Sequence, residues 1–108
     1  MRKLLTTLAL CLCATNAQAA YKSGNDLLTA CKAEGLTCYG YITAAQDTYE
    51  AWVDWGLITE KRMCVPHGVS AEQLRLVVLK YMESKPEALH LNAGSFVLNA
   101  LIVAFPCK

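Results

Sequence analysis

Cysteine content constrains the fold of this 108-residue chain more than any other feature. Arg2 and Lys3, an apolar stretch over residues 4–14, and Ala17-Gln18-Ala19 form the three parts of a secretory signal peptide. The apolar stretch is shorter than the roughly 20 residues of a membrane span, so we expect export and cleavage after Ala19. Two of the six cysteines lie in the removed segment, and four remain to form disulfides: Cys31, Cys38, Cys64 and Cys107.

Residues 20–108 are then expected to form one domain. The chain is 55% hydrophobic and only 18% charged, which excludes a disordered chain. Its formal charge of +1 becomes −1 once Arg2 and Lys3 are removed. The charge therefore gives no reason to expect binding to nucleic acid or to an anionic membrane surface. A domain of this size gains only a thin margin of stability from burial, and two disulfides are expected to add to it.

Apolar residues recur with helical spacing almost throughout, which predicts an all-α fold, a small bundle of four to five helices joined by two disulfides. The first helix is expected to be capped by Asn25 and to end near Gly35. The second is expected to run from Tyr39 or Gly40 to Trp55, with Gly56 as its stop. Residues 59–70, with a proline and a glycine among polar residues, are predicted to be a loop.

Two sequences of the capping-box type predict the last two helices. Ser70 and Gln73 are expected to open the third, because each side chain can satisfy a backbone donor at the other residue. The second sequence, Ser84-Lys85-Pro86-Glu87, is expected to open a fourth helix that runs to Ala104.

Helix direction predicts the disulfide pairing. Neighbouring helices joined by short connections run antiparallel. Cys31 and Cys38 then flank the turn between the first two helices. Cys64 and Cys107 are expected to lie close together at the opposite end of the bundle. We therefore expect Cys31 to pair with Cys38, and Cys64 with Cys107.

The predicted fourth helix is apolar around most of its circumference. A helix of that kind is buried on most sides. A homodimer whose interface covers part of this helix would account for it. The alternative is a central helix in a monomeric bundle.

No residue pattern predicts catalysis. Cys64-Val65-Pro66-His67 has the spacing of half a metal site, but zinc needs three or four ligands and a disulfide competes for the thiol. Neither His67 nor His90 stands in a recognisable context for a cysteine nucleophile. The carboxylates are scattered and no glycine-rich phosphate loop is present. We expect a non-enzyme without metal or cofactor.

An ordered series of short motifs resembles the Rap/Tai family of type VI secretion immunity proteins over about residues 25–107. The motifs are Cys38-Tyr39-Gly40-Tyr41, Cys64-Val65-Pro66-His67-Gly68-Val69-Ser70, Gln73-Leu74, Val77-Val78, Tyr81, Lys85-Pro86-Glu87-Ala88-Leu89-His90 and Ala104-Phe105-Pro106-Cys107. The chain departs from the family at Ala44 and Ala45, where a Gly-Val pair is usual, and at Lys85, where His often stands.

The resemblance implies a periplasmic, all-helical, disulfide-bonded protein, commonly a homodimer, that binds a peptidoglycan amidase toxin and blocks its access to peptidoglycan. The motif residues are expected to be structural, with Gly40 and Gly68 in tight backbone and Ser70 and Gln73 in a cap. The full set, besides the cysteines, is Gly40, Tyr41, Pro66, Gly68, Ser70, Gln73, Pro86, Glu87 and Pro106.

The segment after the second helix is the predicted toxin-binding surface, because it mixes aromatic and charged residues near a loop. Its residues are Trp52, Asp54, Trp55, Glu60, Lys61 and Arg62. In the alternative interpretation Trp52 belongs to the core and residues 60–62 form a solvated turn. Two other functions fit the same sequence: a small periplasmic helical chaperone or envelope-stress protein, and a family member that has changed its target.

Overall fold

The computed structural model describes residues 21–33 and 35–108. The predicted signal peptide and its cleavage site lie outside these residues. The described chain folds into four α-helices and one 3₁₀ turn: α1 (Gly24–Lys32), α2 (Leu36–Asp54), α3 (Ala71–Glu83), η1 (Pro86–Ala88) and α4 (Ala93–Ala104). Among the described residues only two isolated β-bridges occur, and no strand. The predicted all-α bundle with two disulfides is confirmed.

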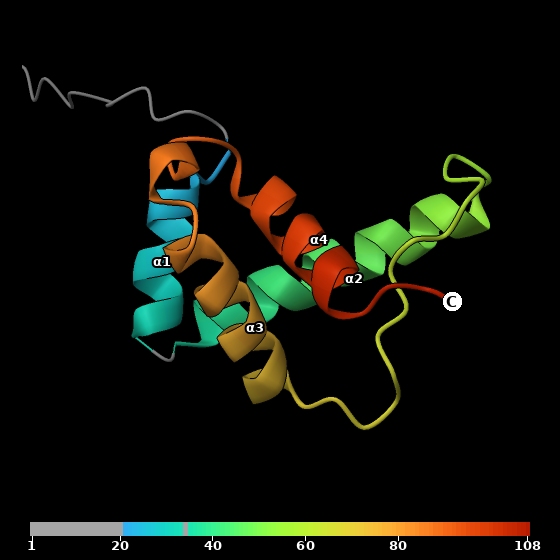
Figure 1. Ribbon diagram of the computed structural model, residues 1–108, viewed down its shortest axis with the longest axis horizontal. Helices are drawn as coiled ribbons and strands as arrows, with labels where there is room; N and C mark the ends of the chain where they lie inside the picture. Colours follow the sequence, from blue (N-terminus) through green and yellow to red (C-terminus); the bar gives the residue numbers. More distant parts are fainter. Residues whose placement is uncertain (1–20, 34) are drawn as a thin grey trace, which may run out of the picture.

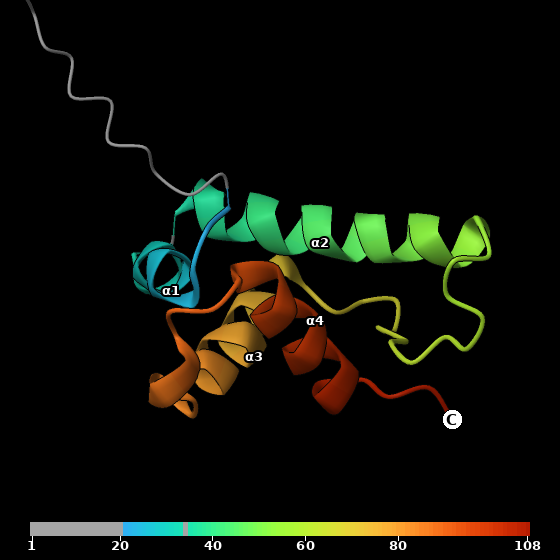
Figure 2. The same cartoon turned by 90° about the horizontal axis from the view of Figure 1, so that it is seen from above.

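The long helix α2 lies across the other helices (Figures 1 and 2). In both views α1 lies beside the start of α2, and Figure 2 shows α3 and α4 on one side of α2. Each of the four α-helices packs against the other three, and the contact between α3 and α4 is the most extensive. The core consists of fifteen buried apolar residues: Leu27, Cys31, Cys38, Ile42, Tyr49, Met63, Leu74, Val78, Met82, Leu89, Ala93, Phe96, Val97, Ala100 and Leu101.

Side-chain caps begin three of the helices. Ser70 and Gln73 form the predicted capping box of α3, with the Gln73 amide donating to the Ser70 hydroxyl at 3.1 Å and the Ser70 amide to the Gln73 side chain at 2.8 Å. The cap of α1 was predicted at Asn25 but is Ser23, which forms a capping box with Asp26. The sequence Ser-x-x-Asp satisfies the same two backbone donors, and this places the helix start two residues earlier.

Helix α2 begins earlier than predicted, at Leu36 rather than at residue 39 or 40. Its N-cap, Gly35, has extended backbone and makes no side-chain cap. The Cys38 amide donates to the Gly35 carbonyl at 3.1 Å, which closes the first turn. The connection from α1 is therefore only a few residues long, and α1 and α2 pack directly against each other.

The fourth helix does not begin at Ser84, so that prediction is wrong. Ser84 is instead the C-cap of α3, and its hydroxyl donates to the Tyr81 carbonyl at 2.6 Å. Pro86 opens only the three-residue turn η1. Helix α4 starts at Ala93, where the Asn92 side chain accepts from the amide of Gly94 at 2.8 Å.

Both disulfides pair as predicted from helix direction. Cys31 at the end of α1 is bonded to Cys38 at the start of α2, with their Cα atoms 4.9 Å apart. Cys64 is bonded to Cys107, with a Cα separation of 5.0 Å. The two bridges therefore lie at opposite ends of α2, the first beside its start and the second beside the segment that follows its end.

Candidate functional site

The end of α2 and the segment that follows it project beyond the other helices. We call this part of the chain, residues 49–63, the arm. Both views show α2 extending past the ends of α3 and α4, with the following loop turning back toward the C-terminus (Figures 1 and 2). The arm is thus built on one rigid element, the last turns of a 19-residue helix.

Contacts between the two limbs of the arm fix its loop against α2. The backbone amide of Arg62 donates to the phenolic oxygen of Tyr49 at 2.8 Å, and Tyr49 is almost fully buried. Lys61 Nζ lies 3.0 Å from the Glu50 carboxylate, an exposed pair that contributes little to stability. Met63 is completely buried and so anchors the returning limb in the core.

The base of the arm is tied to the C-terminal segment. Met63 forms an antiparallel β-bridge with Pro106. The Cys64 amide donates to the Phe105 carbonyl at 2.9 Å, next to the disulfide between Cys64 and Cys107. The arm is therefore held on one side by α2 and on the other by the last residues of the chain.

A Schellman motif ends α2 and sets the shape of the arm's outer end. Gly56 has a φ of 75°, a left-handed conformation in which glycine carries no Cβ penalty. Its amide donates to the Val53 carbonyl at 3.0 Å, and the Leu57 amide donates to the Trp52 carbonyl at 2.9 Å. These are the two hydrogen bonds that define the motif.

Three apolar side chains at this outer end face solvent. Trp55 is 72% exposed, Leu57 is 69% exposed and Trp52 is 38% exposed. Exposed aromatic residues on a rigid support are the composition of binding hot spots. Leu57 is not among the binding residues predicted from the sequence, although an apolar residue directly after a helix-ending glycine is a signal that could have identified it.

All six residues of the predicted binding surface lie on the arm and are exposed: Trp52, Asp54, Trp55, Glu60, Lys61 and Arg62. Trp52 is not among the buried core residues, because it stands at the edge between the arm and a groove. Lys61 is engaged with Glu50, whereas Arg62 is fixed through its backbone. The structure brings the six residues together at one end of the molecule.

An apolar groove of about 260 Å³ runs between α2 and α4 and reaches the arm at Trp52. Two aromatic residues, Tyr41 and Trp52, line it, and small residues make up most of the rest of its lining. The full lining is Tyr41, Ala44, Ala45, Thr48, Trp52, Gly94 and Leu98. The exposed apolar surface of the arm therefore continues along one side of α2.

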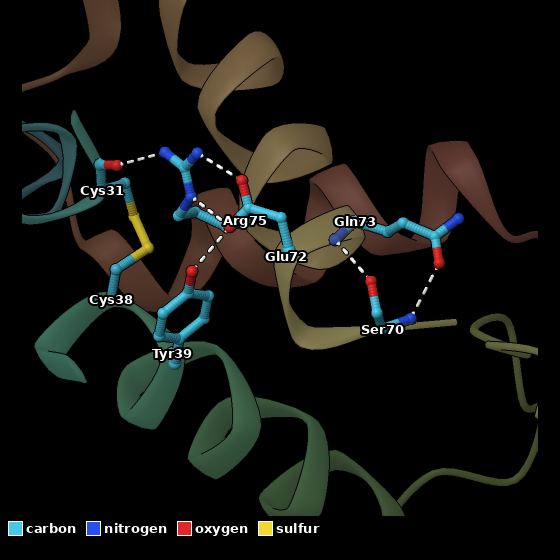
Figure 3. A network of polar contacts seen from close by, with 7 residues as sticks. All are labelled: Cys31, Cys38, Tyr39, Ser70, Glu72, Gln73 and Arg75. Atoms are coloured by element: carbon cyan, nitrogen blue, oxygen red, sulfur yellow. Dashed lines mark hydrogen bonds and ion pairs between the residues drawn. A yellow bond between two sulfur atoms is a disulfide. The ribbon is translucent and has the colours of Figure 1, made fainter. Parts of the chain in front are cut away.

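A polar network joins the first three helices at the other end of α2 (Figure 3). Arg75 is only 4% exposed. Its guanidinium donates to the Cys31 carbonyl at 2.6 Å. Two of its nitrogens donate to the Glu72 carboxylate, at 2.6 and 2.8 Å. The Tyr39 hydroxyl donates to the same carboxylate at 2.6 Å. The network links α3 to the end of α1, beside a disulfide, and to the start of α2.

Charge in this network shifts two pKa values. Hydrogen bonds first from Arg75 and then from Tyr39 lower the pKa of Glu72 to about 2, because they stabilise its charged form. The hydrogen bond to that carboxylate raises the pKa of Tyr39. Both shifts follow from contacts that hold helices together, so the network is structural.

The family-motif residues are placed as follows. Gly68 has a φ of 93°, which supports the expected tight backbone there. Gly40 lies inside α2 with open space where a Cβ would stand, so the same expectation is wrong for Gly40. Tyr41 lines the groove, and Pro106 lies in the bridge that holds the arm. Pro66, Pro86 and Glu87 are exposed.

No metal site forms within the described residues, since no three His, Cys, Asp or Glu side chains cluster there. Cys64, the first residue of the possible half-site, is in a disulfide. Nor is any helix among residues 21–33 and 35–108 long and apolar enough to cross a membrane.

The fold and the arm define a small, disulfide-bonded helical protein that exposes an apolar surface on a rigid projection. A model of the Rap1a immunity proteins matches residues 23–107, and the chain belongs to this family. Membership indicates an immunity protein, a non-catalytic protein directed against a secreted effector. No curated protein and no solved structure matches the chain.

Proposed function

We propose that the protein is a periplasmic immunity protein that binds a type VI secretion peptidoglycan amidase and inhibits it without chemistry of its own. The observation that carries this proposal is the match to the Rap1a immunity proteins over residues 23–107. The amidase as target, and type VI secretion as its route, come from the resemblance to the Rap/Tai family. An inhibitor of this kind needs only to occupy the substrate path of the toxin.

The arm is the surface we propose for toxin binding. Trp55 and Leu57 present a rigid apolar surface, and Glu60 and Arg62 add charge beside it. Binding through a preorganised surface loses little conformational entropy. The Schellman motif at Gly56 and the hydrogen bond between Tyr49 and Arg62 supply that preorganisation.

The two disulfides support a periplasmic location. Disulfides form and persist in oxidising compartments such as the bacterial periplasm, and the cytosol keeps thiols reduced. Cleavage of the predicted signal peptide after Ala19 would deliver the domain there.

Homodimer formation remains part of the proposal, with α3 and α4 as the interface. Val103 on α4 is 70% exposed. It lines an apolar groove of about 340 Å³ between these two helices, together with Val77, Lys80, Tyr81, Ser84, Ala100 and Ala104. Light scattering should give the dimer mass for the native protein and the monomer mass for Val103→Asp. A monomer mass for the native protein at micromolar concentration would exclude the dimer.

Co-expression with a periplasm-targeted amidase tests the function directly. The toxin is chosen from candidate amidases encoded near the gene for this protein, and cell lysis is the readout. We expect the native protein to prevent lysis and a double variant, Trp55→Ala with Leu57→Ala, to protect poorly. Leu76→Ala is the matched control, because Leu76 is a half-exposed leucine on α3, outside the arm. Equal lysis with and without the native protein would exclude immunity against that toxin.

A further inference from the structure

The two disulfides differ in their access to solvent. Cys31 and Cys38 are both completely buried. Cys64 is exposed and Cys107 is half-buried. A thiol reduces a disulfide by direct attack on one sulfur, so an exposed bridge reacts in the native state, whereas a buried bridge reacts only after the protein opens.

The exposed bridge also joins the segment that follows α2 to the end of the chain. Residues 59–70 contain no helix, and no other covalent link joins them to the C-terminal segment. Apart from the disulfide, the backbone connection is the Met63–Pro106 β-bridge, which is made by two hydrogen bonds, from Cys64 to Phe105 at 2.9 Å and from Cys107 to Arg62 at 3.4 Å. Met63 is buried in the core, and Val65 and Phe105 pack against it. The buried bridge, by contrast, joins two helices within the core.

Cationic residues flank the exposed bridge. Arg62 precedes Cys64 by two positions, and Lys108 follows Cys107 directly. The hydrogen bond from the Cys107 amide to the Arg62 carbonyl brings the two segments together. Nearby positive charge stabilises a thiolate, both as the attacking group and as the leaving group.

From these observations we propose that Cys64–Cys107 is a site of thiol–disulfide exchange with dithiol reductants, and that its opening loosens residues 56–69 while the helices stay folded. A thiolate of the reductant attacks Cys64 Sγ, and Cys107 leaves as a thiolate that takes up a proton. The second thiol of the reductant then displaces Cys64. Two electrons pass to the bridge, the protein gains two thiols, and the dithiol is oxidised to a disulfide.

Limited reduction of the oxidised full chain with dithiothreitol tests this proposal. Free thiols are alkylated at intervals and located by mass spectrometry, and helix content is followed by far-ultraviolet circular dichroism. We expect Cys64 and Cys107 to be alkylated at least about tenfold faster than Cys31 and Cys38, with helix content retained. Hydrogen exchange at residues 56–69 should rise at the same time.

Three outcomes would overturn the proposal: all four cysteines reacting together as helix content is lost, Cys31 and Cys38 reacting first, or neither bridge opening before the protein unfolds. The double variant Cys64→Ser with Cys107→Ser is the control, and the amides of its residues 56–69 should exchange rapidly without reductant. Should that variant fail to fold, hydrogen exchange of the native chain decides. None of these readouts requires the toxin, so their outcome does not depend on the proposed function.

Discussion

The backbone amide of Arg62 donates a 2.8 Å hydrogen bond to the phenolic oxygen of Tyr49, across thirteen residues of sequence. Tyr49 is 5% exposed, so water has little access to this bond. It joins the returning limb of the arm to α2 one residue before the buried Met63. Together with the buried Met63, this contact holds the returning limb against α2.

Tyr49→Phe should destabilise the protein by about 1–3 kcal/mol, because it leaves a poorly hydrated amide without an acceptor. Urea unfolding should show a lower midpoint with an unchanged slope, and the Arg62 amide should exchange faster. Tyr21→Phe is the matched control, since Tyr21 is 56% exposed, and its effect should stay within about 0.5 kcal/mol. Equal midpoints for the two variants would mean that the Tyr49 hydroxyl contributes nothing.

Two glycines should respond oppositely to alanine. A Cβ on Gly24 would stand 2.7 Å from Phe96 Cε2 and 2.9 Å from the Leu89 carbonyl oxygen, so Gly24→Ala should cost about 1–3 kcal/mol. Gly40 lies inside α2 with nothing within 4 Å of that position. Gly40→Ala should therefore add about 0.5–1 kcal/mol of stability. Thermal unfolding of both variants checks the pair, and a loss of stability in Gly40→Ala would contradict the open space described.

The start of the fourth helix was predicted wrongly because tertiary contacts override the local sequence signal there. Ser84-Lys85-Pro86-Glu87 matches a helix start, yet the Leu89 and Leu91 carbonyls accept from the Asn25 and Gly24 amides, each at 2.8 Å. These bonds tie residues 89–91 to the start of α1. The chain must turn there, and it resumes a helix only after Asn92.

Local motifs and the pairing of the four cysteines could be predicted, whereas polar contacts between side chains of different helices could not. The capping box at Ser70 is local, and the pairing of Cys64 with Cys107 follows from helix direction alone. The Arg75 network joins residues that are far apart in sequence, as with the 44 positions between Arg75 and Cys31. No periodicity or spacing in the chain encodes that contact. The arm lies between these cases, because its composition was visible but its projection beyond the bundle was not.

Acid should weaken the network around Arg75. The pKa of Glu72 falls from 4.5 to about 2 in the folded protein, so its contribution to stability is full above pH 4.5 and disappears as the pH falls toward 2. Urea midpoints of the native protein and Glu72→Gln should differ most near pH 6 and converge near pH 2. The Ser23 amide lowers the pKa of Asp26 in the same direction, so Glu72→Gln should retain part of the acid sensitivity. A constant difference between the two proteins from pH 6 to pH 2 would exclude the role given to Glu72.

Trp55→Ala should weaken toxin binding without weakening the fold. Trp55 is 72% exposed and lies next to the helix-ending glycine, so its removal leaves the core unchanged. An aromatic hot spot contributes about 2 kcal/mol or more, which corresponds to about 30-fold in the dissociation constant. Calorimetric titration with the purified amidase measures this loss, and thermal unfolding confirms that the variant is folded. Leu76→Ala, which removes an exposed leucine from α3, should bind as the native protein does. Unchanged affinity in Trp55→Ala, with a loss in Leu76→Ala, would move the binding surface from the arm to α3.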